Sequence, residues 1–217
     1  MDIYHNVVGF FQSGGIFMYP IVVVLALGVA IAIERWLYLS VARTSNFRLW
    51  RKIQPHLAAG DLRQVAMLTE KSNSAISHIF GYGLNRARTS RRRDDVEMAM
   101  EEGLMETVPN LEKRTGYLAT FANIATLLGL LGTIIGLIQA FTAVASANPS
   151  EKADMLSASI SVAMNTTAFG LMVAIPLLLI YAVLQTKTTQ LVDSLEMASV
   201  KFLNSLPESS AQGARAG

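Results

Sequence analysis

Two long stretches of the chain, 117–150 and 155–186, contain no charged residue and no histidine. Each is longer than the roughly 20 apolar residues that a helix needs to cross the hydrocarbon core of a bilayer, which is about 30 Å thick. A third stretch, 16–39, contains a run at 21–27 that is apolar on every face of a helix. The pattern of hydrophobic positions therefore predicts three membrane-spanning helices.

The two uncharged stretches carry small and hydroxylated residues at steps mostly of three and four, which places them on one side of a helix. Lipid tails cannot satisfy an amide or a hydroxyl, so this side is expected to face protein or water. Close helix packing and the lining of an ion path both explain the pattern. Three adjacent polar residues at 165–167, which fan around more than half of a helix, favour an ion path there. The two sets are Asn123, Thr126, Gly129, Gly132, Thr133, Gly136, Gln139 and Ala140, and Ser157, Ser159, Ser161, Asn165, Thr166, Thr167, Gly170 and Ala174.

The charges around these stretches predict how the chain crosses the membrane. Of the 18 lysine and arginine residues, 13 lie between Arg43 and Arg114, and none precedes Arg35. Because cytoplasmic segments are enriched in Lys and Arg, we expect the N-terminus outside and the C-terminus in the cytoplasm. The expected order is an extracytoplasmic segment 1–15, spans at 16–40, 116–147 and 157–186, a cytoplasmic helical domain at 41–115, an extracytoplasmic loop at 148–156, a cytoplasmic helix at 187–206 and a disordered tail at 207–217.

Local signals predict where the cytoplasmic helices begin. Asp61 precedes an apolar-periodic segment at 62–71 and is expected to be its N-cap. Asp94 or Asp95 is expected to cap the helix that runs towards Thr115. Both predictions use the preference of helix starts for short side chains that accept a backbone N–H bond.

Further signals concern the ends of the spans. A continuous helix at 116–149 would be about 50 Å long, so we expect it to merge with the cytoplasmic helices. Glu34 and Arg35 are expected at the cytoplasmic boundary, with Arg35 extended outwards, because neighbours in sequence do not face each other on a helix. Pro176 is expected to bend the third span, and apolar residues after Lys187 indicate that this helix continues into the cytoplasm.

Composition excludes several kinds of chemistry. Hydrophobic residues make up 52% of the chain and charged residues 16%, a membrane-type balance, and there is no cysteine. His5, His56 and His78 lack metal-ligand spacing. The basic run 91–93 is too short for a nucleic-acid site, is typical of a solvated corner or a lipid-headgroup contact, and is soon followed by acidic residues. We therefore expect no catalytic residue, no metal, no cofactor and no nucleic-acid partner.

Two longer motifs resemble those of a known family. The segment 129–138, Gly-Leu-Leu-Gly-Thr-Ile-Ile-Gly-Leu-Ile, preceded by Leu-Glu-Lys-Arg at 111–114, resembles the second-helix motif of the ExbB/TolQ/MotA proton-channel family. The segment 165–171, Asn-Thr-Thr-Ala-Phe-Gly-Leu, with Val-Ala-Ile-Pro at 173–176, resembles the third-helix motif. Three spans and a large first cytoplasmic loop are similar to the ExbB/TolQ branch, whereas the MotA branch has four helices.

The resemblance implies a multi-pass subunit of the bacterial inner membrane. Family members assemble as a homopentamer whose second and third helices line a pore. A dimer of a single-span ExbD- or TolR-like partner, with an essential membrane aspartate, lies in that pore, and the work reaches a TonB- or TolA-like protein that spans the periplasm. Together with the polar cluster, the resemblance assigns the proton pathway to Thr133, Asn165, Thr166 and Thr167, and helix packing around the pore to Gly129, Gly132, Gly136, Gly170 and Pro176.

The residues give an independent reason for such a partner. A proton path through a membrane normally uses an ionisable side chain, and the two uncharged stretches contain none. Another chain must then bring the titrating group. Many family members have a glutamate five residues before the position of Thr167, where this chain has Val162. This departure makes proton transfer depend more on the partner's aspartate, and it leaves open whether the driving ion is H⁺ or Na⁺.

The leading hypothesis is an ion-driven stator subunit with no activity alone. A self-sufficient channel or transporter would need its own charged site at membrane depth, and only the pair of Glu34 and Arg35 comes close. An intramembrane enzyme would need paired membrane aspartates, a Ser–His dyad or a histidine cluster, and the sequence contains none of these. A structural scaffold would tolerate apolar replacements across 165–167.

Overall fold

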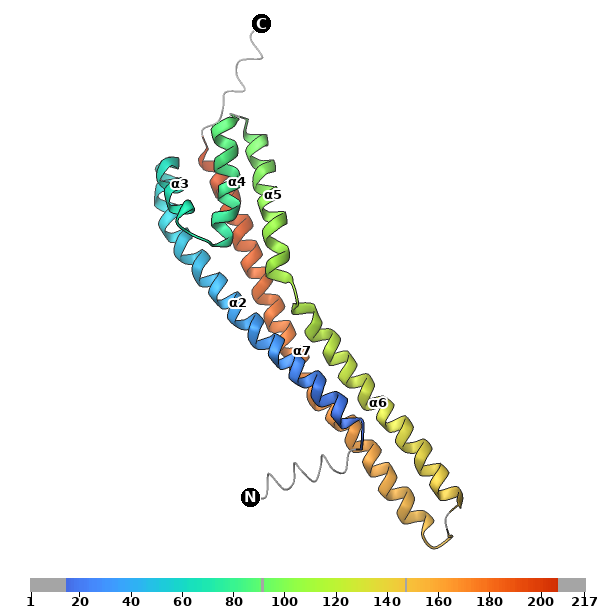
Figure 1. Ribbon diagram of the computed structural model, residues 1–217. Helices are drawn as coiled ribbons and strands as arrows, with labels where there is room; N and C mark the ends of the chain where they lie inside the picture. Colours follow the sequence, from blue (N-terminus) through green and yellow to red (C-terminus); the bar gives the residue numbers. More distant parts are fainter. Residues whose placement is uncertain (1–14, 91, 147, 207–217) are drawn as a thin grey trace, which may run out of the picture. The chain divides into compact units, whose positions relative to one another are not determined.

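The computed structural model describes residues 15–90, 92–146 and 148–206, and these residues form helices joined by short turns (Figure 1). The expected N-terminal segment up to residue 14 and the expected tail 207–217 lie outside the described residues. The described helices are α2 (Met18–Ala58), α3 (Leu62–Glu70), α4 (Ala75–Thr89), α5 (Arg93–Glu112), α6 (Thr115–Ser146) and α7 (Lys152–Ser205).

Three helical segments are long and apolar enough to cross a membrane. They are Met18–Ala58, Arg93–Ala145, which includes the short break between α5 and α6, and Lys152–Ser205. No strand occurs in the part of the chain that the structure describes. The prediction of an all-α chain with three helices able to span a membrane is confirmed.

The chain divides into two compact units. The first, called here the span unit, comprises Met1–Arg35 and Arg114–Val183, and so contains the start of α2, all of α6 and most of the uncharged part of α7. The second, the bundle unit, comprises Trp36–Lys113 and Leu184–Gly217, and so contains the rest of α2, helices α3 to α5 and the end of α7.

An aromatic core holds the bundle unit together. Phe80 of α4 meets Trp50 of α2 edge-on with ring centroids 6.4 Å apart, and it lies 4.8 Å from the ring of Phe202 on α7. Phe80 and Phe202 are fully buried, and each such burial contributes about 1.5–3 kcal/mol. A Cβ on Gly83 of α4 would lie 2.7 Å from Met100 of α5, so these two helices approach closely. The core therefore joins α2, α4, α5 and α7 at one level of the bundle unit.

Two predictions about helix ends are confirmed. The side chain of Asp61 caps α3 by accepting the backbone N–H of Gln64 at 3.1 Å. Helix α7 continues without interruption past Lys187, and its end carries the buried residues Leu191 and Leu195 at the predicted spacing. Burial of this apolar stripe in the bundle unit explains why the helix does not end with its uncharged stretch.

The predicted cap of α5 is wrong. Asp94 and Asp95 lie inside the first turn, where their carboxylates still favour the positive end of the helix dipole. Ser90 takes part in the helix start instead, because its hydroxyl accepts the backbone N–H of Arg92 at 3.2 Å and donates to Asp95 at 2.6 Å. The N-cap residue of α5 is Arg92, whose side chain makes no capping bond, and Ser90, three residues before the helix, instead holds the segment that leads into it.

A two-residue break separates α5 from α6, so the expected merged helix is also wrong. Arg114 has a φ of +66°, in the left-handed region that non-glycine residues rarely adopt. One Nη atom of Arg114 lies 3.5 Å from a carboxylate oxygen of Glu34 on α2. The ion pair ties the start of α6 to α2 within the span unit.

Arg35 does not extend outwards, and that prediction is wrong. Its side chain is only 1% exposed, whereas that of the neighbouring Glu34 is 41% exposed and paired with Arg114. The two neighbours do point to different sides of the helix, as expected for adjacent positions. The acid, however, is partly exposed, and the base is buried.

Candidate functional site

Helices α6 and α7 meet along a seam of small residues in the span unit. The contacts step forward along α6 and backward along α7, so the two helices are antiparallel. The facing positions are Ala125 with Gly170, Gly129 with Thr167 and Gly170, Gly132 with Thr166, and Gly136 with Ala163. We call these eight residues the α6–α7 seam.

The distances across the seam leave no room for a side chain at Gly132, Gly136 or Gly170. A Cβ on Gly170 would lie 2.6 Å from the backbone oxygen of Ala125 and 3.1 Å from the Cα of Gly129. A Cβ on Gly132 would lie 2.5 Å from the methyl carbon of Thr166. Real Cβ atoms essentially never come within 3.0 Å of another heavy atom. Glycine is therefore required at these positions for the helices to approach this closely.

A hydrogen bond joins the two helices in the middle of the seam. The hydroxyl of Thr167 on α7 donates to the backbone carbonyl of Gly129 on α6 at 2.8 Å. Thr166, which is 2% exposed, instead donates to the carbonyl of Val162 on its own helix at 3.1 Å. Asn165 has intermediate exposure. The adjacent polar residues thus have different local roles.

Thr133 lies at the edge of the seam. Its hydroxyl donates to the carbonyl of Leu130 on its own helix at 2.6 Å, and its exposure is intermediate. In an ideal helix Thr133 is rotated by about 40° from Gly129 and by about 100° from Gly132. The residue is therefore close to the inter-helix contact but open on one side.

The hydroxyls of Thr133 and Thr167 can accept a further hydrogen bond but cannot donate one. The single hydrogen of Thr133 and that of Thr167 are both donated to backbone carbonyls, whereas each hydroxyl oxygen can still accept. Such an oxygen can accept a hydrogen bond from water or from a protonated carboxyl group, but it has no hydrogen left for a carboxylate. The arrangement therefore favours a neutral acid over its anion.

Asp, Glu, His, Lys and Arg residues are absent from the middle of the described spans. None occurs at 18–33 in α2, anywhere in α6, or at 155–183 in α7. The carboxylates among the described residues of the span unit are Glu34, Glu151 and Asp154, near the helix ends. No group of three or more His, Cys, Asp or Glu side chains that could hold a metal ion occurs in the described part of the chain.

Large apolar side chains cover the surface of α6 and α7 away from the seam. Contiguous exposed apolar surface of this kind marks contact with a membrane or with protein. Pro176 is also on the exposed side, whereas Leu177 next to it is buried against Gly28 of α2. The exposed residues include Leu127, Leu130, Leu131, Ile134, Ile138 and Phe141 of α6 and Met164, Leu171, Met172, Ile175 and Leu179 of α7.

The structure groups some of the predicted site residues and separates others. Gly129, Gly132, Gly136 and Gly170 lie in the seam with Thr166 and Thr167. Thr133 lies at the edge of the seam, and Pro176 lies outside it. Sequence reasoning missed Ala125 and Ala163 as facing residues, although each is a small residue one turn from a seam residue on its own helix.

Residues 71–197 match the sequence model of the MotA/TolQ/ExbB proton channel family, which is well over half of the 217 residues. The chain belongs to this family. The matched part includes all of α6 and α7 up to Met197, and therefore the whole seam. The MotA/TolQ/ExbB chain is accordingly a membrane protein with a proton-channel role in energy transduction.

Individual relatives place this MotA/TolQ/ExbB protein in the ExbB/TolQ branch, as the motifs predicted. A homolog of the biopolymer transport protein ExbB from Methanothermobacter thermautotrophicus is 29% identical over 203 residues, 91% of this chain and 69% of the relative. Biopolymer transport protein exbB1 of Vibrio cholerae is 30% identical over 166 residues, 76% of this chain and 73% of the relative. The Tol-Pal system protein TolQ of Haemophilus influenzae is 35% identical over 83 residues, 38% of this chain and 36% of the relative.

Proposed function

We propose that this chain is the stator subunit of a proton-driven motor in the bacterial inner membrane. In this proposal it forms a homopentamer around a dimer of a single-span, ExbD- or TolR-like partner, and the work is delivered to a TonB- or TolA-like protein. Proteins of this family work with partner proteins. The observation that carries the proposal is the lack of Asp, Glu, His, Lys and Arg residues in the middle of the described spans, beside a seam edged by hydroxyls.

The chemistry of the hydroxyls supports a mechanism in which the partner carries the proton and this chain supplies the polar surface. An ionised carboxylate is costly at membrane depth, so an acid that moves along the spans does so most easily in its protonated form. Thr133 and Thr167 can accept a hydrogen bond from that protonated acid while their own hydrogens stay on backbone carbonyls. In this mechanism the partner brings the proton, and this chain supplies a fixed polar surface that favours the neutral acid. The same oxygens would hold a water molecule that passes the proton on.

The remaining site residues have supporting roles in the proposal. The close contact at Gly129, Gly132 and Gly170 makes α6 and α7 one rigid wall, so the hydroxyls keep their positions while the partner moves. At Val162, whose Cγ1 would lie 3.4 Å from a Cβ on Gly15, an apolar side chain offers no proton relay.

Reconstitution with and without the partner tests the proposal. The full-length chain alone in lipid vesicles is expected to show no selective proton uptake above protein-free vesicles. Uptake driven by a pH gradient is expected when the single-span protein that copurifies with it is added, and it is expected to disappear when that protein's membrane Asp is changed to Asn. The measurement is the fluorescence of a pH-sensitive dye inside the vesicles.

The same assay gives the result that would overturn the proposal. Rapid, cation-selective leakage from the chain alone would make it a self-sufficient channel. In that case Glu34, which is paired with Arg114 at the end of the spans, would be the first residue to examine.

A further inference from the structure

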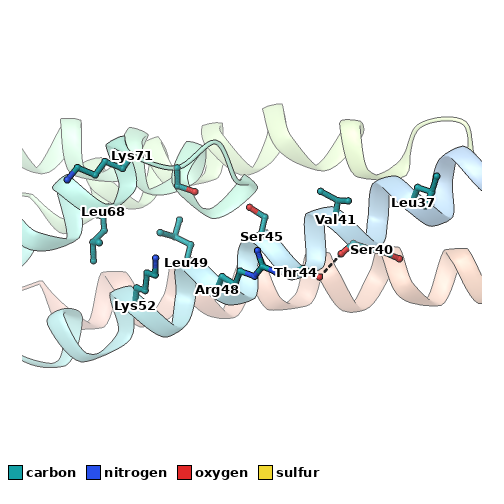
Figure 2. Close-up of a pocket in the computed structure, with 11 residues that line it drawn as sticks. Leu37, Ser40, Val41, Thr44, Ser45, Arg48, Leu49, Lys52, Leu68 and Lys71 are labelled. Atoms are coloured by element: carbon teal, nitrogen blue, oxygen red, sulfur yellow. Dashed lines mark hydrogen bonds between the residues drawn. The ribbon is translucent and has the colours of Figure 1, made fainter.

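A groove of about 670 Å³ lies between α2 and α3 in the bundle unit (Figure 2). Arg48 and Lys52 line it from α2, and Lys71 lines it from the residue that follows α3. Among the residues that the structure describes, no acidic one lines the groove. The other lining residues are hydroxyl-bearing, such as Ser40, or apolar, such as Leu37 and Val41.

The cations of this groove are not neutralised by any acidic side chain that the structure describes. Arg48, Lys52 and Lys71 are exposed, and none of them takes part in an ion pair within the described part of the chain. Three like charges around one hollow create a positive potential that attracts an anionic surface. At the other end of the groove Leu37 and Val41 are 59% and 68% exposed. The occupant is therefore expected to be acidic at one end and apolar at the other.

Helix α5 has a surface of this composition. Glu97 and Glu101 are one helical turn apart, both are exposed, and neither forms an ion pair with another described residue. Met105, one turn further along, is 74% exposed. Because positions four apart lie on one helix face, these three residues form a strip that is acidic towards the start of α5 and apolar towards its end. We call it the acidic strip.

Contacts within the bundle unit show at which height along the axis of the helices, called here the level, the groove and the acidic strip lie. Trp50 of α2 contacts Phe80 of α4, and Gly83 of α4 faces Met100 of α5, so the levels of Trp50 and Met100 coincide within about one turn. Nearer the other end, residues 38–45 of α2 and 106–111 of α5 line one common cavity. Helix α5 therefore runs antiparallel to α2.

Because α5 and α2 are antiparallel, the charged ends of the groove and of the acidic strip lie at one level, and their apolar ends lie at another. Glu97 and Glu101 lie at the level of Arg48 and Lys52, because both pairs flank the level of Trp50 and Met100. Met105 lies nearer the level of Val41. Copies of the chain that cross one membrane in the same direction keep their bundle units at one level. The acidic strip of one copy can therefore meet the groove of the next copy with its charged ends and apolar ends aligned.

We infer that the groove between α2 and α3 binds the acidic strip of α5 from a second copy of this chain. The inference rests on the homo-oligomer in the proposed function and names one contact that would build it. Each copy offers one groove and one strip, so the contact is head-to-tail and can close a ring. A lipid headgroup fits less well, because Lys52 lies about 18 Å along α2 from Ser40, and each headgroup layer is only about 5–8 Å thick.

Disulfide cross-linking in membranes tests this contact directly, because the natural chain contains no cysteine. The full-length chain with Lys52→Cys and Glu97→Cys is expected, on mild oxidation, to give a ladder of covalent multimers, whereas either single variant is not. Lys52→Cys with Glu196→Cys is the matched control. Glu196 is an exposed acid on α7, next to Met197, which lines a cavity with Trp50 and so lies near the same level. This control pair is expected to give no ladder.

Charge reversal provides a second, independent readout. Arg48→Glu with Lys52→Glu is expected to reduce the oligomer recovered in mild detergent about fivefold, since exposed ion pairs are individually weak but act together here. Adding Glu97→Lys and Glu101→Lys to the same chain is expected to restore it, because each groove again faces a strip of opposite charge. Arg63→Glu, an exposed reversal on α3 outside the groove, is expected to have no effect.

The outcomes separate this contact from the proposed function. An intact oligomer on native gels without the Lys52–Glu97 ladder would overturn the contact and leave the proposed stator role untouched. Absence of any oligomer in the natural chain would overturn both. If the ladder is missing and the groove reversal instead removes bound phosphatidylglycerol, the groove is a lipid site and the inference is wrong.

Discussion

Replacing Thr167 with valine is expected to lower partner-dependent proton flux at least about tenfold while the assembled protein remains in the membrane. Valine keeps the shape of threonine and removes its hydroxyl. The change deletes the bond to the carbonyl of Gly129 and the oxygen that is proposed to accept from the partner's protonated acid. Each of these two hydrogen bonds between uncharged groups contributes roughly 0.5–1.5 kcal/mol, so the loss of both costs about 1–3 kcal/mol, and about 1.4 kcal/mol corresponds to a factor of ten. Dye-based proton uptake in vesicles that contain both proteins measures the effect.

Conservative variants distinguish this role from simple packing. Thr167→Ser restores the hydroxyl without the methyl group and is expected to recover most of the flux. If Thr167→Ser were as inactive as Thr167→Val, the methyl contact rather than the hydroxyl would matter. Full flux in Thr167→Val would remove the proposed role of this residue altogether.

The same reasoning extends to Thr133, for which α6 offers a matched control. Thr133→Val is expected to lower flux, whereas Thr142→Val is expected to leave it within about twofold of the natural chain. Thr142 also donates its hydroxyl to a carbonyl of α6, that of Ile138 at 2.8 Å. It is nine residues from Thr133 and therefore about 180° around the helix. Equal losses in both variants would point to a general effect on α6 and not to a path along one side of it.

The sequence was sufficient to predict three helices able to cross a membrane and a face of small residues on two of them, because both depend on local composition. Long uncharged stretches have few alternatives to a membrane helix, and glycines at steps of three and four mark a close contact whichever helix lies opposite. The cap at Asp61 was predictable for the same reason, since a cap bond spans only three residues.

Features that depend on distant residues were not predictable. The partner of Glu34 is Arg114, 80 positions later, and the burial of Arg35 likewise depends on tertiary structure. The break before α6 falls at Lys113 and Arg114, neither of which is a glycine or a proline that would mark it. The bond from Thr167 to Gly129 needs the register between two helices, which a list of small residues does not contain.

The register of the seam also explains why packing and ion path were hard to separate from the sequence. Gly129 supplies both the close approach to Gly170 and the carbonyl that accepts from Thr167. Close approach is what brings the hydroxyl within 2.8 Å of that carbonyl. The small residues therefore hold the helices at the distance that the hydrogen bond of Thr167 requires. A change that separates the helices is expected to move the hydroxyls as well.

The second large effect expected is the destabilisation caused by Gly170→Ala. The added Cβ would lie 2.6 Å from the backbone oxygen of Ala125 and 3.1 Å from the Cα of Gly129. Backbone atoms cannot rotate away, so the helices must move apart. Overpacking of this kind costs about 1–3 kcal/mol, and we expect the upper part of that range because the Thr167 bond is lost as well. The midpoint of unfolding in mixed detergent and SDS micelles measures the loss.

Two further variants make this prediction specific to the seam. Gly116→Ala on α6, where a Cβ would meet no atom within 4 Å, is expected to be neutral or to stabilise the protein by up to about 1 kcal/mol.

Gly132→Ala is expected to destabilise because its Cβ would lie 2.5 Å from the methyl carbon of Thr166. Since that methyl belongs to a side chain, Thr166→Ser is expected to recover part of the loss in Gly132→Ala. It is expected to recover none of the loss in Gly170→Ala, where the obstacle is backbone. Equal recovery in both would mean that the helices do not meet in the register described.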